Sequence, residues 1–179
     1  MVQDTSIVVR RASKEDMAIA NEIQSVVNLA YRSEGGWTTE SHLVGGERST
    51  LEAIQEAIVD QTNLLYLAVD TLEQNKVVGT VQLQVSADHP GEAEIGLLSV
   101  LPTCQSRGVG SKLVRHAMDQ MPLLGFKKAV MHVLNVREDI LGWYEKKLGF
   151  ERTGETEEFV WPDMLKDKSI HFLVLKRDV

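Results

Sequence analysis

The N-terminal part of the chain combines a short apolar segment with two stretches of helical spacing. Residues 7–10, Ile-Val-Val-Arg, predict a short strand. Ser13 and Asp16 have the spacing of a capping box, and the apolar residues behind them recur every three or four positions, which predicts an amphipathic helix. Its buried face would hold Ile19, Ile23, Val26, Val27 and Ala30. A second capping box, Ser49-Thr50-Leu51-Glu52, predicts the start of another helix.

From residue 64 onward the apolar pattern becomes that of strands. Residues 64–69 are almost continuously apolar, which is typical of a buried strand. In residues 77–85 the apolar positions Val81, Leu83 and Val85 alternate with polar ones, which predicts an antiparallel strand covered on one face only. Further strands are predicted at residues 94–100 and 129–134, and near 150–155 and 170–176.

Two more helices lie among these strands. Gly108 and Gly110 precede a run whose apolar residues share one helical face, and a stripe through Ile140 and Tyr144 ends at Gly149. A strand–helix–strand unit thus sits inside an otherwise antiparallel sheet. We expect a mixed α/β fold of about seven strands and about four helices, and the 179 residues predict one domain over 1–179.

Composition and charge narrow the class of protein. Hydrophobic residues make up 43% and charged residues 25%, as in ordinary globular proteins. The net charge of −7 disfavours binding to a nucleic acid backbone. Cys104 is the single cysteine, and no Cys/His spacing predicts a metal site. We expect no secretory signal and no membrane segment, and therefore a cytoplasmic protein.

The segment from Gln105 to Lys112 carries the strongest chemical signal. It follows a predicted strand, contains two glycines one residue apart, and leads directly into a helix. Backbone N–H groups at a helix start, together with the helix dipole, form a natural site for phosphate groups, and Arg107 and Lys112 add positive charge. A Walker loop would need the order Gly-Lys-Ser/Thr, and a dinucleotide fingerprint would need Gly where Leu113 stands, so neither fits.

The signature Gln/Arg-x-x-Gly-x-Gly/Ala of the GNAT superfamily of N-acetyltransferases is filled here by Gln105, Gly108 and Gly110. The chain resembles this superfamily over residues 92–150. Residues 94–102 and 144–150 also have the family's spacing. The resemblance implies a splayed sheet, acetyl-CoA as acyl-donor cosubstrate, and a pyrophosphate held by backbone N–H groups. The residues assigned to that contact are Gln105, Ser106, Arg107, Gly108, Val109, Gly110 and Ser111.

Acetyl transfer from a thioester to a primary amine needs a base for the amine proton and an acid for the leaving thiolate. By the resemblance, Tyr144 is the expected proton donor; the alternative is a purely structural tyrosine in the buried stripe. Glu94 is the expected base, directly or through a water; the alternative is a solvated charge at the end of a strand. Backbone N–H groups of Leu98, Ser99 and Val100 are expected to stabilise the oxyanion.

One position departs from the family pattern: Arg137 stands where many relatives have Asn, and the nearest Asn is Asn135. Either residue is expected to contact coenzyme A. Trp37 and Glu40, between the first two helices, are expected to contact the acceptor amine, unless Trp37 only covers the core or Glu40 pairs with Arg48. The sign of the acceptor's charge stays open.

Two alternatives to an acetyltransferase stay open as well. One is a non-catalytic regulatory module that binds acyl-CoA, and the other is a transferase for a longer acyl group. The expected partners are acetyl-CoA and an amine acceptor, with no nucleic acid and no membrane, and the protein is expected to be a monomer or a homodimer.

Overall fold

The computed structural model describes residues 5–34 and 39–179. Seven strands form one sheet in the order β1-β2-β3-β4-β5-β7-β6, in which only the β4–β5 pair is parallel. The strands are β1 Ile7–Arg11, β2 Leu64–Asp70, β3 Lys76–Val85, β4 Glu92–Val100, β5 Lys128–Leu134, β6 Glu151–Glu158 and β7 His171–Asp178. The α-helices are α1 Ala20–Arg32, α2 Leu51–Val59, α3 Val109–Leu123 and α4 Glu138–Leu148. The predicted mixed α/β class is confirmed.

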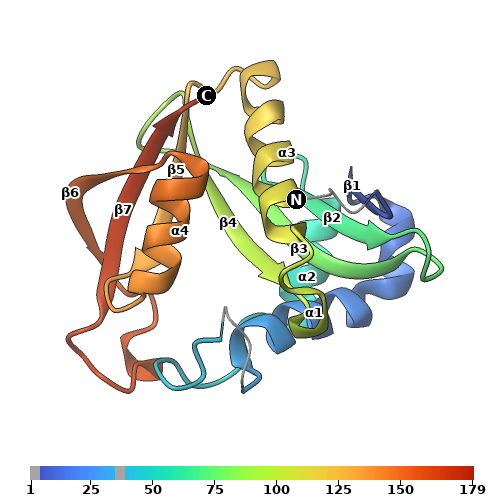
Figure 1. The fold of residues 1–179 in the computed structure, drawn as a ribbon, viewed down its shortest axis with the longest axis horizontal. Helices are drawn as coiled ribbons and strands as arrows, with labels where there is room; N and C mark the ends of the chain where they lie inside the picture. The colour runs from blue at the N-terminus through green and yellow to red at the C-terminus, as the bar shows by residue number, and fades with distance from the viewer. Residues whose placement is uncertain (1–4, 35–38) are drawn as a thin grey trace.

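The helices lie on both faces of the sheet (Figure 1). Helices α1 and α2 pack on one face, whereas α3 packs across β2, β3 and β4 on the other and α4 lies beside it in front of β5 and β7. One main hydrophobic core runs through these layers. Among the described residues, no helix is both long and apolar enough to cross a membrane.

Two predicted helix starts were misplaced. Ser13 does form a capping box with Asp16, but the turn that follows is a 3-10 helix over Lys14–Ile19, and α1 begins only at Ala20. In the second case Thr50, not Ser49, is the N-cap, because its hydroxyl accepts a hydrogen bond from the N–H of Ala53. Because both serine and threonine can serve as an N-cap, the sequence left the start of this helix uncertain by one residue.

The prediction that β3 is covered on one face only was wrong. Thr80 and Gln82, the polar residues of the alternation, are buried along with Val81 and Leu83. Helices α1 and α3 both pack on β3, one from each side of the sheet. The buried Thr80 hydroxyl is satisfied by the carbonyl oxygen of Leu97, at 2.7 Å.

Strands β4 and β5 are paired only at one end. Their parallel ladder covers Glu92–Glu94 and the partners Lys128–Val130, after which the strands diverge (Figure 1). A bulge in β4 lies within the divergent part, where the register with β3 shifts and Leu97 has a φ of 47°. This region of the sheet therefore leaves backbone groups of β4 that β5 does not pair.

A second, smaller core anchors the segment between α1 and α2 to the far end of the sheet. Val44 packs with Leu134, Phe159 and Ile170, and it forms an isolated bridge with Leu165. The segment after residue 39 therefore lies beside the β6–β7 connection. This contact brings residues of the N-terminal third next to the end of β5.

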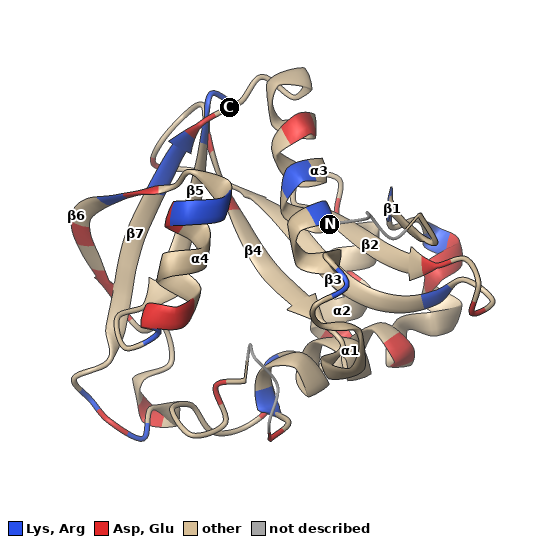
Figure 2. Cartoon of the chain, viewed as in Figure 1, with Lys and Arg blue, Asp and Glu red and all other residues tan. Residues whose placement is uncertain are grey.

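The edge strand β6 is exposed along its whole length and rich in glutamate. Figure 2 shows acidic residues along β6 and basic residues at the end of the adjacent β7. Charged side chains on an edge strand oppose pairing with another sheet.

Gly79 is a tight point between the sheet and α3, and its replacement tests this packing. A Cβ atom there would lie 2.7 Å from the carbonyl oxygen of Ser99 and 2.9 Å from Leu113 Cδ1. We expect Gly79→Ala to lower the free energy of unfolding by about 2 kcal/mol, because backbone and helix must move apart. Urea denaturation measures the change.

The matched control is Gly142→Ala, because a Cβ at this α4 position meets nothing within 4 Å. Alanine is the better helix former by about 1 kcal/mol, so we expect the control to stabilise the protein. Equal stability of the wild type and the Gly79→Ala protein would contradict the close packing of α3 on β3.

Candidate functional site

A large cleft opens where β4 and β5 diverge. Its volume is about 890 Å³, and its walls come from the end of α1 and the α1–α2 segment, β4, β5, the first half of α3, one face of α4, the end of β6 and the β6–β7 connection. Of the residues predicted from sequence, it is lined by Glu40, Glu94, Leu98, Val100, Gln105, Ser106, Gly108, Val109, Gly110, Ser111, Arg137 and Tyr144.

The turn before α3 forms one end of the cleft. Ser106 and Gly108 have φ angles of 73° and 76°, so the chain turns sharply before Gly108 caps the helix. The first bond across this cap runs from Lys112 N–H to Gly108 O, at 3.0 Å. Helix geometry leaves the N–H groups of Val109, Gly110 and Ser111 without acceptors inside the helix. Such a helix start attracts a phosphate group.

The basic side chains of this turn do not reach the cleft, contrary to the sequence-based expectation. The Arg107 guanidinium lies 2.9 Å from the Asp70 carboxylate, and Lys112 Nζ donates to the carbonyl oxygen of Ile7 at 2.7 Å. Both side chains tie α3 to strands β1 and β2. The charge that faces the cleft here comes from the backbone and from Arg115, one turn further along α3.

The expected oxyanion residues divide between the cleft and the core. Leu98 and Val100 line the cleft, whereas Ser99 is fully buried, with its hydroxyl against that of Thr80. Leu98 is fixed by Tyr31, whose hydroxyl donates to the Leu98 carbonyl oxygen at 2.6 Å. The bulged part of β4 thus places Leu98 at the wall of the cleft.

Tyr144 lies on α4 at the wall of the cleft, with its ring packed between Trp143 and Phe150. Its hydroxyl makes no hydrogen bond to the residues that the structure describes. Burial raises the pKa of this hydroxyl well above its usual value, and the nearby Tyr31 and Glu40 add to the shift. The group therefore remains protonated at neutral pH, as a proton donor must.

Glu94 belongs to a cluster that the sequence did not predict. Its carboxylate lies 2.9 Å from Nδ1 of His132 on β5, and Glu157 of β6 approaches Nε2 of the same ring at 3.2 Å without the alignment of a hydrogen bond. All three residues line the cleft. The contact with Glu94 raises the pKa of His132 despite the opposing effect of burial.

The pH dependence of stability tests this cluster. Because folding raises the pKa of His132, the charged contact contributes below the unfolded value of about 6.5 and is lost as the pH rises through the folded value. The difference in free energy of unfolding between the wild type and His132→Gln is expected to be largest near pH 6. It should shrink towards pH 9, as measured by urea denaturation at each pH.

His116→Gln is the control with the opposite sign. Burial lowers the pKa of His116, which lies edge-on to the Tyr66 ring. Its contribution to stability is therefore expected to grow as the pH rises towards neutrality. A difference for His132→Gln that is constant or grows with pH would contradict the charged His132–Glu94 contact.

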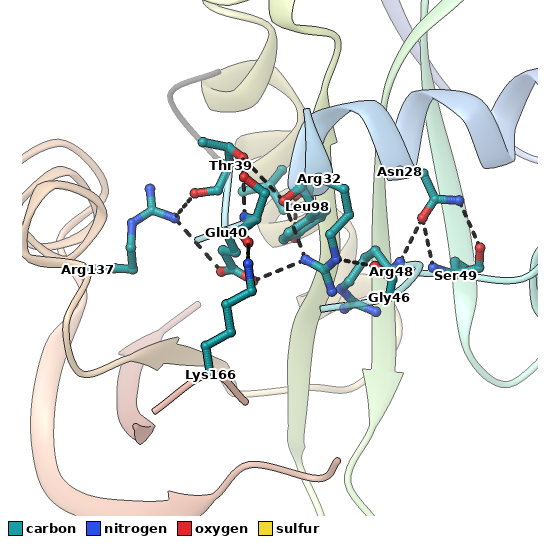
Figure 3. A network of polar contacts seen from close by, with 12 residues as sticks. Asn28, Arg32, Thr39, Glu40, Gly46, Arg48, Ser49, Leu98, Arg137 and Lys166 are labelled. Atoms are coloured by element: carbon teal, nitrogen blue, oxygen red, sulfur yellow. Dashed lines mark hydrogen bonds and ion pairs between the residues drawn. The ribbon is translucent and has the colours of Figure 1, made fainter. Parts of the chain in front are cut away.

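The other side of the cleft holds a network around Glu40 (Figure 3). The Glu40 carboxylate lies 3.9 Å from a guanidinium nitrogen of both Arg32 and Arg137, and its burial raises its pKa. Arg48 makes no ion pair with Glu40 within 4 Å, although its charge also acts on the Glu40 carboxylate, so the sequence-based alternative of a close Glu40–Arg48 pair is not observed. Trp37, the other residue expected to contact the acceptor, lies outside the described residues.

Of the two residues at the departure from the family pattern, only Arg137 lines the cleft. Its guanidinium is held by both carboxylate oxygens of Asp139 and donates to the carbonyl oxygen of Thr39 at 3.1 Å. Asn135 instead accepts a hydrogen bond from the N–H of His171 at the start of β7.

The sequence did not single out several cleft residues: Arg32, Arg115, Trp143, Lys147 and Glu157. Trp143 and Lys147 are one helical turn apart on α4 and adjoin the Tyr144 stripe, so helical spacing alone can group them with Tyr144. Glu157 lies in a uniformly polar strand, and nothing in that pattern distinguishes it.

Comparisons with known proteins agree with this geometry. Residues 27–150 match the model of the acetyltransferase (GNAT) family. The chain is 30% identical to human N-acetyltransferase 8B over 104 residues. These matched residues make up 56% of this chain and 45% of the human protein. The chain thus spans under half the length of this curated relative.

Solved structures share the fold over nearly the whole chain. An N-acetyltransferase from Staphylococcus aureus superposes with a TM-score of 0.72 at 14% identity, covering 96% of this chain and 97% of that one. The IAA acetyltransferase from Bacillus cereus gives a TM-score of 0.66 at 22% identity, covering 97% and 100%. Because the family model spans more than half of the chain, and the sheet, cleft and glycine turn agree with it, this protein belongs to the GNAT family of acetyltransferases.

Proposed function

We propose that the protein is an N-acetyltransferase that moves an acetyl group from acetyl-CoA to a primary amine by direct attack in a ternary complex. The observation that carries this proposal is the arrangement of the cleft. The free N–H groups at the start of α3 and the hydroxyl of Tyr144 face one space, next to the bulged part of β4.

The residues at the α3 end fit the phosphate part of coenzyme A. Gly110 carries no side chain, and a Cβ there would only touch Trp143 and Val100 at 3.7 Å, so backbone and ligand can come close. Arg115 and Lys147 line the same cleft and add positive charge. With the pyrophosphate at this helix start, the acyl part of the donor extends along β4 towards Leu98.

Proton transfers decide the roles of the side chains. A lysine-like amine has a pKa of about 10.4, so at pH 7 roughly one molecule in 2,500 is neutral and able to attack. Glu94 accepts the amine proton, directly or through a water. Backbone N–H groups from Leu98 to Val100 stabilise the charge on the carbonyl oxygen. As the C–N bond forms and the C–S bond breaks, Tyr144 gives its proton to the leaving thiolate, and the second proton lost by the nitrogen returns to Tyr144, directly or through water.

His132 and Glu157 extend this base. A protonated His132 between two carboxylates orients Glu94 towards the cleft and separates its charge from that of Glu157. Glu157, on the other side of the His132 ring, is more exposed to solvent than Glu94.

The proposal is tested by two measurements on the purified protein. Calorimetric titration with coenzyme A is expected to show binding, and a panel of primary amines with acetyl-CoA is expected to release free thiol with at least one member. Binding without thiol release from any amine would favour the regulatory module. Competition among acyl-CoAs in a thermal-shift assay separates acetyl transfer from transfer of a longer acyl group.

A further inference from the structure

The cleft wall around Glu40 holds more arginines than carboxylates, and the charge of Glu40 is shared among three of them. Arg32, Arg48 and Arg137 all line this wall. Arg137 is matched by Asp139 at 3.0 Å, and Arg32 lies near the half-buried Glu40. For Arg48, none of the carboxylates in the part of the chain that the structure describes lies within 4 Å.

Arg48 is held in place although it is not paired. Its guanidinium carbon lies 5.0 Å from the centroid of the Tyr31 ring, and its backbone N–H donates to Asn28 Oδ1 at 2.7 Å. Figure 3 shows Arg48 beside Arg32 at the end of α1. A partly buried guanidinium without an anionic partner is costly, and bidentate contact with a carboxylate is its preferred interaction.

The position of Arg48 relates it directly to the proposed point of reaction. The Tyr31 ring that Arg48 covers donates its hydroxyl proton to the carbonyl oxygen of Leu98. The Tyr31 ring therefore lies between the Arg48 guanidinium and Leu98 in the bulge of β4. Further along β4 lies Glu94, and its partner His132 brings Glu157 of β6 close to it. The cleft thus has a cationic and an anionic side on either side of Leu98.

We propose that the acceptor is an amine that also carries a carboxylate close to its nitrogen, as a free amino acid does. Arg48, assisted by Arg32, binds the carboxylate, and the ammonium group is directed towards Glu94. This inference rests on the proposed function, because it names the substrate class of the same cleft. An acceptor that carries both an ammonium group and a carboxylate can interact with both sides of the cleft, with Glu94 reached directly or through a water.

The first test compares matched acceptors. Each common amino acid is assayed with acetyl-CoA beside the amine that lacks its carboxylate, such as phenylalanine beside phenethylamine and leucine beside 3-methylbutylamine. For the preferred acceptor, kcat/KM is expected to be at least about tenfold higher with the carboxylate present, which corresponds to about 1.4 kcal/mol. Amines that react equally well or better without the carboxylate overturn the inference.

The second test assigns the effect to Arg48. Arg48→Gln is expected to raise KM for the preferred amino acid roughly tenfold or more while changing kcat less than about threefold, because uniform binding is lost. The matched amine should be affected by less than about twofold. Arg48→Lys should restore part of the affinity, since it keeps the charge but not the planar fork. Equal losses for acid and amine would contradict the assignment.

The control variant is Arg11→Gln, which removes an exposed arginine that bonds to Gln61, outside the cleft. Thermal unfolding of each variant verifies that it is folded. Calorimetric binding of the amino acid and the amine to protein saturated with coenzyme A is a readout independent of turnover. If the wild type binds the amino acid but does not acetylate it, and Arg48→Gln abolishes this binding, this inference is supported and the proposed function is rejected. Absence of both binding and transfer of amino acids overturns the inference.

Discussion

Replacing Tyr144 with phenylalanine is expected to lower kcat at least about 100-fold, equivalent to about 2.7 kcal/mol of barrier, while leaving the affinity for acetyl-CoA nearly unchanged. The substitution keeps the ring that packs against Trp143 and Phe150, and the lost hydroxyl makes no hydrogen bond within the described part of the chain. Folding should therefore be preserved. The missing proton donor forces the thiolate to leave unprotonated.

Tyr66→Phe is the matched control, because Tyr66 is a buried tyrosine of β2 that does not line the cleft. Its kcat is expected to stay at the wild-type value. Steady-state kinetics with the best amine of the panel, together with a titration of coenzyme A, measures both parameters. If turnover of the Tyr144→Phe protein stays within about twofold of the wild type, or about 0.4 kcal/mol, the assignment of the proton donor is wrong.

Gly110→Asp is expected to weaken the binding of coenzyme A about 100-fold, or about 2.7 kcal/mol, without unfolding the protein. Gly110 is in the first turn of α3, where a carboxylate is favourable to the helix dipole. The same carboxylate occupies the place of the pyrophosphate and repels it. A variant that is folded and still fails to bind would locate the phosphate site at this helix start.

Two controls accompany this variant. Ala53→Asp places the same residue in the first turn of α2, at an exposed position outside the cleft, and should leave affinity for coenzyme A unchanged. Gly110→Ala separates the effect of bulk from that of charge, because a Cβ there makes only ordinary contacts. Unchanged affinity of the Gly110→Asp protein would place the pyrophosphate elsewhere and reject the proposed cradle.

Local patterns in the sequence predicted most of the elements correctly, because each pattern reports on the immediate surroundings of a segment. The continuous apolar run at 64–69 became the fully buried β2, and the glycine pair became the turn that opens α3. The misplaced helix starts are local ambiguities of one turn or less, whereas the error in β3 concerns surroundings supplied from far away. The alternation in β3 predicted one covered face, but α1 and α3 bury both.

The residues of the candidate site also fall into two groups, those that local motifs indicated and those that only the fold brings to the cleft. Glu94, Tyr144 and the glycine turn were assigned by their resemblance to short family motifs with fixed spacing, and all of them line the cleft. The partners of Glu94, His132 and Glu157, are on two other strands that only the sheet order brings together.

The sequence by itself determined the succession of strands and helices and the turn that presents backbone N–H groups, since both depend on residues near one another in the chain. The tertiary structure decided which charges face the cleft. It turned Arg107 towards Asp70 and away from the cleft, and it left Arg48 over the Tyr31 ring. Charges act through space, so their partners follow from how the strands and helices pack and not from their spacing along the chain.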